Sequence, residues 1–394
     1  MNSFSKPKWV LCCLFFGCSL ALHAADEVDV TRAGLTYDGP YDEAILNGGI
    51  HLVVDQCDDG GWAWDDHDVC PATSPTNTVA PIVDGLLVVN EKFGLNMIKN
   101  AALEGTAHGL TSVFTNGNEA GEVRLWSQSA LHLWRVWALT GDDAYRNFVV
   151  DNYYEKFLAG NYRFDQDIDD FIAASRRTTT AYVNLRSWEF APQVLAAERF
   201  CYQGISDKFK EGILTALNDL TNTTTYTYQG DIVYKAYDVL GIAGAVLGLA
   251  RVNYVNDFPA PINAPNHSDV NGMINLEELT DHLVGLQNPD GSFYDKSGLA
   301  LTADGSNPLA DTQTTAYAVL ALVKAQERFP NKNYLPAIES AKIWLASMQD
   351  VDGGFLSYPG GDKNSEIEAE AIQALGTEGV YDRIFQGQME CYVN

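Results

Sequence analysis

Apolar residues recur at helical spacing along most of this chain, in two kinds of segment that alternate. One kind is amphipathic, with an apolar stripe opposite a polar face, which is typical of a helix with one side on a core. The other kind carries small residues at matching helical positions, most clearly in 316–322 and 369–375. The pattern predicts an all-α chain. The amphipathic segments cover residues 41–56, 145–158, 205–220, 276–286 and 335–348.

The small-residue pattern repeats six times. With 316–322 and 369–375 as the frame, weaker copies align at 80–86, 133–139, 191–197 and 243–249. Successive copies start 52 to 73 residues apart, close to the length of one helical hairpin with its loops. Because small side chains allow close approach, these helices suit an inner ring and the amphipathic ones an outer ring. We therefore predict an (α/α)6 toroid that forms a single domain of residues 26–394.

Residues just before the aligned copies support this alignment. Four residues before each start stand Thr76, Ser129, Ser187, Val239, Thr312 and Ser365. All but the valine are of types that cap helix N-termini. Pro81 and Pro192 would fall in the second turn of their helices, where a proline removes a hydrogen bond. We expect those two helices to start later or to kink.

A phrase of the form Gln-x-x-Asp-Gly-small-aromatic occurs three times, at 56–62, 287–293 and 349–355. Each copy follows an amphipathic segment and precedes another helix, which places it at a corner between two helices. The glycines allow a turn where a Cβ would clash. We expect the glutamine amide to bond backbone groups left free at a helix end, and the aromatic ring to fold back onto that end.

The third copy, with the helix before it, resembles a known motif. Trp344-Leu-Ala-Ser-Met-Gln349, followed by Gly353-Gly-Phe355, is similar to the QW motif of squalene cyclases and related terpene cyclases. The other two copies match its second half and carry His51 and His282 where the aromatic is expected. The resemblance implies an α/α toroid, a fold shared with prenyltransferase β-subunits, thioester domains and secreted polysaccharide lyases. Fold alone therefore leaves function open.

Three of these families have chemical signatures that the sequence can be searched for. The prenyltransferase resemblance implies a zinc site with a cysteine, and no mature cysteine here starts an inner helix. The Gly-Cys-Gly-Glu-Gln stretch of thioester domains is absent. Asp167-Ile-Asp169-Asp170 matches the Asp-x-Asp-Asp acid of class II terpene cyclases, but it stands well before the third inner helix and not at its start. Terpene cyclisation stays open as an alternative.

Residues 1–25 have the composition of a secretory signal. Two lysines precede an apolar run over 9–22, and two alanines follow it. We expect cleavage there and export, to the periplasm or the medium. Cys18 follows a sequence similar to a lipoprotein box, but Phe16 is bulky where that box has a small residue. Lipid anchoring at Cys18 is therefore the less favoured alternative.

Removal of this segment leaves four cysteines, an even number that indicates disulfides in an exported chain. Cys57 and Cys70 bracket one loop and form the more favoured pair, which leaves Cys201 to bond Cys391. Four buried free thiols are the alternative.

The chain is strongly acidic, with a formal net charge of −27 at pH 7. A field of that sign repels polyanions, whereas nucleic acids and anionic membranes are bound through basic stripes. The longest apolar run of the mature chain, 239–250, is too short to cross a bilayer. We expect no nucleic-acid partner, no membrane span and a monomer.

Residues at the starts of the inner helices form the candidate site, because in a helical toroid these starts meet at one mouth. Carboxylates there would serve as acid and base in glycoside hydrolysis, whereas a histidine or tyrosine base beside an arginine would serve a lyase. Tryptophans would stack on sugar rings. The alternative is ion pairing between helices and aromatic packing. The candidate catalytic residues are His132, Arg135, Arg186, Glu189, Tyr237, Asp238 and Asp311, the candidate substrate-binding residues are Trp126, Trp134, Trp188, Gln128 and Gln313, and Glu366 and Glu368 fall nearby.

Two acidic loops offer the oxygen ligands that calcium prefers. One lies between Cys57 and Cys70. The other, Asp165-x-Asp167-x-Asp169, begins like an EF-hand loop, but its later positions depart from that pattern. The alternative is a solvated acidic surface, and the chemistry above requires no cofactor.

These observations favour an exported carbohydrate-active enzyme, a polysaccharide lyase or a glycoside hydrolase, with a glycan in a central cavity. The net charge disfavours a polyuronate substrate unless the pocket is locally basic, for which Arg135, Arg177 and Arg186 are the candidates. The alternatives are a non-catalytic toroid that binds a glycan or a protein, and a terpene cyclase-like enzyme that uses Asp167–Asp170.

Overall fold

Glycine and alanine let the inner helices approach until their backbones meet. In the computed structural model, a Cβ added to Gly85 would lie 2.9 Å from the carbonyl oxygen of Ala369, closer than real Cβ atoms come to such an atom. One added to Gly244 would overlap the backbone of Trp188. The small residues that define the repeat are therefore the residues at which neighbouring helices touch.

The chain forms two units, Met1–Glu43 and Ala44–Asn394. In the first, the Asp42 carboxylate accepts hydrogen bonds from the backbone N–H groups of Asp38 and Gly39. The predicted signal segment lies outside the described residues, so its cleavage and the lipid anchor at Cys18 stay predictions. The structure describes residues 35, 37–64, 70–113, 121, 129–159, 187–218, 225–228, 231–234, 238–251, 256–264, 268–294 and 310–377.

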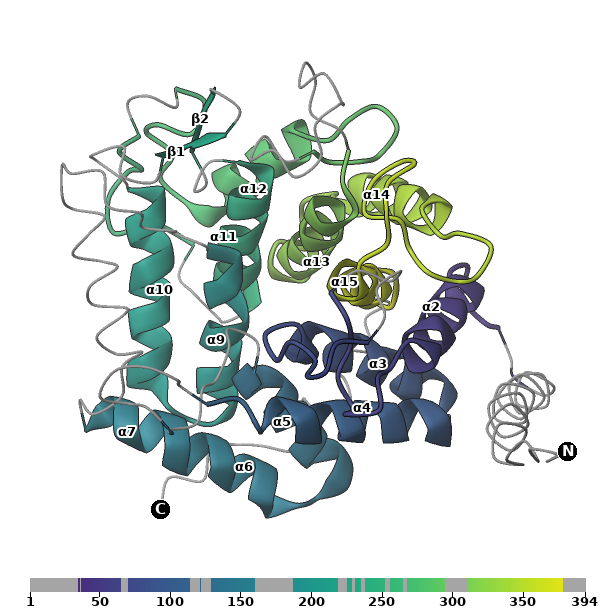
Figure 1. The fold of residues 1–394 in the computed structure, drawn as a ribbon. Helices are drawn as coiled ribbons and strands as arrows, with labels where there is room; N and C mark the ends of the chain where they lie inside the picture. Colours follow the sequence, from purple (N-terminus) through teal and green to yellow (C-terminus); the bar gives the residue numbers. More distant parts are fainter. Residues whose placement is uncertain are drawn as a thin grey trace, which may run out of the picture. The chain divides into compact units, whose positions relative to one another are not determined.

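Six helices form a closed inner ring in the second unit (Figure 1). They are α3 (Val79–Phe93), α5 (Ser129–Thr140), α9 (Ser187–Arg199), α11 (Val239–Arg251), α13 (Thr312–Arg328) and α15 (Ser365–Leu375). Each packs on the next in this order, and α15 packs back on α3, so the ring closes. Five of these helices begin four residues before their copy of the aligned repeat. The exception is α3, which by that rule would begin at Thr76 and begins three residues later, at Val79.

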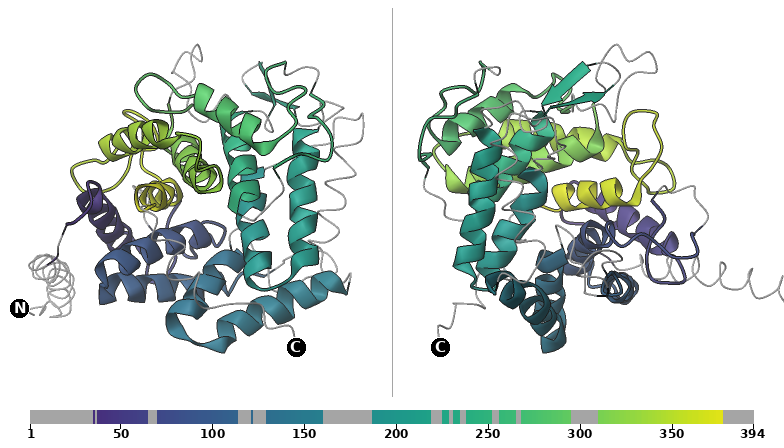
Figure 2. Two further views of the ribbon diagram at one scale, coloured as in Figure 1. Left: turned by 180° about the vertical axis from the view of Figure 1, so that it is seen from behind. Right: turned by 60° about the vertical axis from the view of Figure 1, so that its left-hand side comes forward.

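The amphipathic helices form the outer layer (Figures 1 and 2). They are α2 (Asp42–Val54), α4 (Asn96–Gly109), α10 (Gln203–Leu217), α12 (Leu276–Gly285) and α14 (Leu335–Ser347), together with a run of α6 (Asp143–Val149), the π-helix η1 (Val150–Tyr154) and α7 (Glu155–Leu158). α4, α6, α10, α12 and α14 each pack on the inner helix that precedes them in the chain. In α2, Gly48 lies against Ile372 of α15 and Gly49 against Val89 of α3. The predicted (α/α)6 toroid is confirmed.

A short antiparallel hairpin interrupts the helical pattern. It consists of β1 (Thr225–Tyr228) and β2 (Asp231–Tyr234), with Thr225 paired to Tyr234. The hairpin lies between α10 and α11 in the chain, and the helical periodicity did not predict it.

On α13 and α15, the helix caps stand one residue before the positions that the sequence predicted. Thr312 and Ser365 are the first residues of their helices, and the caps are Asp311 and Asn364. The Asp311 carboxylate accepts from the backbone N–H of Thr314 at 2.8 Å. The hydroxyls of Thr312 and Ser365 do not cap their helices. They donate hydrogen bonds to backbone carbonyls elsewhere, Thr312 to that of Leu356 and Ser365 to that of Ala63. Both of these carbonyls directly follow the aromatic residue of a corner, so the inner helices are tied to the corners of neighbouring hairpins.

Pro81 meets the predicted constraint, whereas α9 begins in the repeat frame at Ser187, so for Pro192 only the predicted kink stays open. Pro81 is the third residue of α3, where its missing N–H has no helical partner to lose. This helix starts later than the repeat frame, as predicted. Pro192 lies inside α9.

The amide nitrogen of each corner glutamine donates to two carbonyl oxygens. One belongs to the glycine of its own turn, and the other belongs to the next outer helix of the ring. The sequence predicted a bond to backbone left free at a helix end; the acceptor lies in a neighbouring helix instead. The bonds run from Gln56 to Gly60 and Ala101, from Gln287 to Gly291 and Ala337, and from Gln349 to Gly353 and Ala44, all at 2.8–2.9 Å.

The corner glycines and aromatics complete this contact. Gly60, Gly291 and Gly353 have positive φ, a conformation that side chains rarely adopt. A Cβ on any of them would also strike a backbone carbonyl of the next outer helix. The three corner aromatics are fully buried: Trp62, Phe293 and Phe355.

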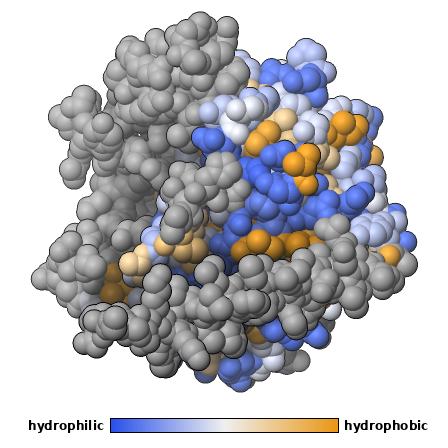
Figure 3. Space-filling model, turned by 45° about the vertical axis from the view of Figure 1, so that its right-hand side comes forward, coloured by the Kyte–Doolittle hydropathy of each residue, from blue (hydrophilic) through white to orange (hydrophobic). Residues whose placement is uncertain are grey.

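A disulfide joins Cys57 to Cys70 as predicted, with Cα atoms 5.7 Å apart. Cys201 is disulfide-bonded as well, and its predicted partner, Cys391, lies outside the described residues. Within the described part of the chain, no helix is long and apolar enough to cross a bilayer. The face shown in Figure 3 is largely hydrophilic over its described residues, with apolar side chains in smaller groups.

Replacement of Gly244 by alanine is expected to lower the free energy of unfolding by about 1–3 kcal/mol or more, because the new methyl group meets the backbone of α9. Gly204 is the matched control, since a Cβ there meets no atom within 4 Å. Gly204→Ala should raise stability by up to about 1 kcal/mol. Urea midpoints of the two variants measure the difference, and equal midpoints would contradict the packing described.

Gln349→Leu is expected to destabilise the fold by about 1–3 kcal/mol, because it removes both amide bonds of the corner that links α14 to α2. Gln203→Leu provides the control. Gln203 is exposed and bonds only within α10, to Asp207, so its loss should change stability by about 0.5 kcal/mol or less. Thermal unfolding of both proteins compares the two effects; a Gln349 variant as stable as the Gln203 variant would refute the role of the corner.

Candidate active site

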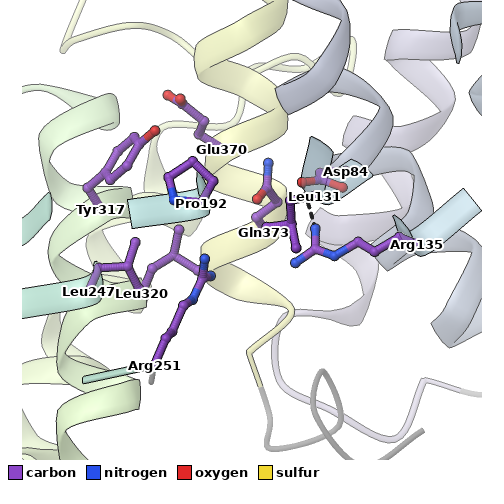
Figure 4. Close-up of a pocket in the computed structure, with 10 residues that line it drawn as sticks. All are labelled: Asp84, Leu131, Arg135, Pro192, Leu247, Arg251, Tyr317, Leu320, Glu370 and Gln373. Atoms are coloured by element: carbon purple, nitrogen blue, oxygen red, sulfur yellow. Dashed lines mark ion pairs between the residues drawn. The ribbon is translucent and has the colours of Figure 1, made fainter. Parts of the chain in front are cut away.

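Side chains from all six inner helices line a cavity on the axis of the ring (Figure 4). We call it the axial cavity, and we call the end of the ring where the inner helices begin the mouth. The cavity has a volume of about 20 Å³, within a wider empty region of about 330 Å³ that includes open solvent. Lining positions on α13 and α15 correspond in the repeat frame, since Tyr317 matches Glu370 and Leu320 matches Gln373. The full lining is Asp84, Leu131, Arg135, Pro192, Leu247, Arg251, Tyr317, Leu320, Glu370 and Gln373.

Glu370 is a deeply buried acid in the lining of the cavity. It is 2% exposed. Its Oε2 accepts a hydrogen bond from Nε2 of Gln313 at 2.9 Å. Its Oε1 is buried and has no hydrogen-bond donor of ordinary geometry among the described residues, although the Tyr317 hydroxyl lies close by. One oxygen of this carboxyl is held by Gln313, and the carboxyl also lies beside the Tyr317 hydroxyl.

The environment of Glu370 favours its protonated form. Burial raises the pKa of the Glu370 carboxyl well above its usual value, and the negative charges of Glu366 and Asp311 add to this shift. The Gln313 amide and the Tyr317 hydroxyl oppose it. Glu370 therefore carries a proton at pH values where ordinary carboxyls are ionised.

Two further acidic side chains, Glu366 and Glu189, lie near the Tyr317 hydroxyl and Glu370. Burial raises the pKa of the Tyr317 hydroxyl well above its usual value, and the charges of Glu370, Glu366 and Glu189 raise it further. Glu366 stands one turn before Glu370 on α15, so both share one face of that helix. Glu366 and Glu189 are half-buried, whereas Glu370 and Tyr317 are buried. A protonated carboxyl thus lies beside two more exposed carboxylates from two helices.

The opposite side of the cavity carries a buried ion pair. The Arg135 guanidinium lies 2.7 Å from the Asp84 carboxylate, and both side chains are almost completely buried. Burial raises the pKa of Asp84, and the positive charges of Arg135 and Arg251 oppose that shift. Arg251 is the last residue of α11. Figure 4 shows both arginines on the side away from Glu370 and the Tyr317 hydroxyl.

The structure brings only some of the candidate residues to the cavity. Glu189 and Gln313 interact with the Tyr317 and Glu370 group. Arg135 lines the cavity, but in an ion pair with Asp84. Trp188 is half-buried at the start of α9, at the repeat position that Gln313 and Glu366 occupy in their helices.

The remaining described candidates have structural partners. The Asp238 carboxylate accepts from the backbone N–H of Gly241 at 2.6 Å, and Asp311 caps α13. His132 is buried. Trp134 is buried beneath the Arg199 guanidinium, which lies 5.3 Å from its ring centre. Glu368 is buried and bonds Nδ1 of His51 at 3.1 Å. Their catalytic or binding roles stay predictions.

Other candidates lie outside the described residues. These are Trp126, Gln128, Arg177, Arg186, Tyr237 and the second acidic loop with Asp165, Asp167, Asp169 and Asp170. Among the residues that the structure does describe, no group of three or more His, Cys, Asp or Glu side chains could hold a metal ion.

Sequence reasoning missed Glu370, Tyr317 and Asp84. The candidates were chosen just before and near the start of each inner helix, and of these Arg135 lines the cavity, whereas Tyr317, Glu370 and Asp84 each stand sixth in their helix. The signal was available, because Tyr317 and Glu370 are polar residues in apolar stretches and stand at one repeat position. Only the close packing of α13 against α15 shows that this position faces the axis.

No family model matches the sequence, and no curated protein matches it either. Solved structures share the fold. An inactive variant of an α-1,6-mannanase of Salegentibacter sp. HEL1_6, bound to α-1,6-mannotetrose, covers 87% of this chain and 99% of its own at 11% identity, with a TM-score of 0.54. An unsaturated glucuronyl hydrolase of Bacillus sp. GL1 covers 85% and 96% at 12% identity, with a TM-score of 0.52. A protein of Listeria innocua covers 85% and 96% at 14% identity, with a TM-score of 0.52.

Glu370→Gln is expected to change how stability depends on pH. Below the unfolded pKa of about 4.5, Glu370 is protonated in both states, so variant and parent should be equally stable. Above that pH, the Glu370 carboxyl ionises in the unfolded parent but stays protonated in the folded parent. The free energy of unfolding of the parent therefore falls by about 1.4 kcal/mol per pH unit relative to the variant, until the pH passes the raised pKa of Glu370 in the folded state.

The measurement is the urea midpoint of both proteins between pH 4 and 9. Glu104→Gln is the control for the loss of one acidic side chain, because Glu104 is exposed on the outer helix α4. A constant difference for the Glu370 variant would show that the carboxyl is not held protonated.

Proposed function

We propose that this chain is an exported glycoside hydrolase in which Glu370 is the general acid. The observation that carries the proposal is the buried Glu370 carboxyl, whose raised pKa keeps it protonated beside the carboxylates of Glu189 and Glu366. Glycoside hydrolysis needs a protonated carboxyl and an ionised one on opposite sides of the scissile bond. Structures of this fold that cleave glycosidic bonds support the assignment, since they include a mannanase and a glucuronyl hydrolase.

In this mechanism, Glu370 donates its proton to the glycosidic oxygen as the bond to the anomeric carbon breaks. The electron pair of that bond stays on the leaving oxygen, which becomes a hydroxyl. Glu189, which comes from α9 and not from the helix of Glu370, stabilises the positive charge at the anomeric carbon, either by attacking it or by activating a water. Gln313 orients the acid through its 2.9 Å bond to Oε2. Tyr317 stays protonated, because burial and the surrounding carboxylates raise its pKa.

The described residues suit a lyase less well. A lyase needs a base to abstract a proton and a cation to neutralise the resulting charge. The raised pKa of the Tyr317 hydroxyl makes it a poor base at neutral pH. Arg135 is paired with Asp84 on the far side of the cavity. Terpene cyclisation fits the cavity poorly too, because it calls for an apolar lining and this one contains acids, arginines and an amide.

Export is supported by the disulfide between Cys57 and Cys70, since such bonds persist in oxidising compartments. The amino-terminal segment of 1–25 has the composition of a secretory signal. Together these features favour a glycan outside the cytoplasm as the substrate.

Release of reducing ends from a panel of neutral and acidic polysaccharides is the first test. Glu370→Gln should lower kcat by about 10²–10⁴-fold on natural substrates. The loss should be much smaller for glycosides with a dinitrophenyl leaving group, which departs without a proton. Activity of the parent should fall as pH rises through the raised pKa of Glu370.

Glu104→Gln serves as the control and should keep full activity, because the residue is exposed on the outer helix α4. Absorbance from unsaturated products in place of simple hydrolysis would indicate a lyase. Tight glycan binding without any turnover would indicate a binding module. Either result would refute the hydrolase assignment.

A further inference from the structure

We propose that the backbone carbonyl of Trp188 on α9 is a binding group of the axial cavity and accepts a hydrogen bond from a hydroxyl group of the bound sugar. Pro192, one turn further along the helix, leaves this carbonyl open to the ligand. The inference rests on the proposed function and adds a binding group to it. The observation that carries it is a proline inside an inner helix, at a position that lines the cavity.

Pro192 is the sixth residue of α9 and is buried. A helical residue normally donates its N–H to the carbonyl of the residue four positions earlier, which here is Trp188. A proline has no N–H to donate, and its ring crowds that same carbonyl. The Trp188 carbonyl therefore lacks the partner that any other residue at position 192 would supply.

The other inner helices show that the fold does not require a proline at this repeat position. The corresponding residues of α13 and α15 are Tyr317 and Glu370, each of which has an N–H for its helix. Pro81 corresponds in α3, but α3 begins at Val79, so the residue four positions before Pro81 lies outside the helix. Among the six inner helices that the structure describes, only α9 loses a helical bond here. Such departures from local helix preference are typical of functional positions.

The Trp188 carbonyl lies on the cavity side of α9, towards the mouth. The ring of Pro192 lines the cavity together with Tyr317 and Glu370 (Figure 4). The nitrogen of residue 192 and the carbonyl of residue 188 face each other along one side of the helix, so that carbonyl shares the side that Pro192 turns to the axis. Trp188 is the second residue of α9, which places it one turn nearer the mouth. The charge of Glu189, the next residue, raises the pKa of the Tyr317 hydroxyl, so this stretch lies beside the proposed acid.

A carbonyl oxygen accepts hydrogen bonds and cannot donate them, so its ligand must offer an O–H or N–H group. Each sugar of a glycan carries several hydroxyl groups, and a sugar that stands beside Glu189 would have one within reach of the Trp188 carbonyl. A ligand that displaces water from this carbonyl without donating to it would bind less tightly. Hydration by water alone is the alternative that the experiment must exclude.

Two replacements of Pro192 that share one side chain test this role. Pro192→Ala supplies an N–H that bonds to the Trp188 carbonyl and occupies it. Replacement of Pro192 by lactic acid, introduced by nonsense suppression, gives the same methyl side chain with an ester oxygen in place of the N–H, so the carbonyl stays open. Calorimetry measures affinity for a tetrasaccharide from the polysaccharide that the parent binds best, with Glu370→Gln in every protein to prevent turnover. We expect the alanine variant to bind about 3–10-fold more weakly than the lactic acid variant.

Monodeoxy forms of this tetrasaccharide identify the hydroxyl group involved. Loss of the hydroxyl that donates to Trp188 should weaken binding to the lactic acid variant by about 3–10-fold and leave binding to the alanine variant unchanged. Pro81→Ala is the control, because Pro81 stands at the same repeat position in α3 and has no helical partner to regain. This control should keep the affinity and the kcat/KM of the parent.

The outcomes separate the inference from the proposed function. Equal affinities of the alanine and lactic acid variants would overturn the inference, because only water would then meet the Trp188 carbonyl, and the hydrolase assignment would remain. The alanine variant should also have the higher urea midpoint; a midpoint no higher would show that its N–H does not bond to that carbonyl, which overturns the inference as well. A parent that binds glycans without turnover would lose the hydrolase assignment, and the same comparison would still decide the role of the carbonyl. Absence of both turnover and binding would remove the two together.

Discussion

The paired hydrogen bonds of the corner glutamines hold neighbouring hairpins at a common spacing. In a ring of hairpins each unit contacts only its neighbours, so a small error at each step would leave the last helix unable to meet the first. The glutamine couples the turn to the next outer helix by joining two carbonyls that belong to different hairpins. The bond from Gln349 to Ala44 is the closing one, because it links the last outer helix to the first. Residues in the axial cavity can face one another only if the ring closes.

Close helix packing and a polar axis make opposing demands on the inner helices. Gly85 and Gly244 bring backbones into contact, which leaves little room for water between the helices. The same helices carry Asp84, Arg135 and Glu370 toward the axis, where burial penalises charge. The protein meets this cost in two ways: Asp84 is paired with Arg135, and Glu370 keeps its proton. The second solution places a buried, protonated carboxyl at the axis, which is the group that we propose as the general acid.

Repetition and chemistry occupy different positions in this fold. Gln56, Gln287 and Gln349 form the same bonds in three corners, which is what a structural role requires. At the axial position shared by α13 and α15, one helix has Tyr317 and the other has Glu370. A site for an asymmetric ligand needs this difference between equivalent positions. The conspicuous repeated phrase is therefore scaffold, and the site that we propose lies where the repeat is broken.

The sequence by itself determined the helices, their division into two layers and the six-fold ring, because these depend on local periodicity and on small residues that recur at fixed intervals. It also indicated the bond between Cys57 and Cys70, since both cysteines bracket one short loop. It predicted the corners but not the acceptors of their glutamines, which lie in other hairpins. Only the tertiary structure decided that Arg135 faces Asp84 and that Glu370 lies between Gln313 and Tyr317. Those partners are far apart in the chain, and their pKa values depend on burial and on neighbouring charges that exist only when six helices close around one axis.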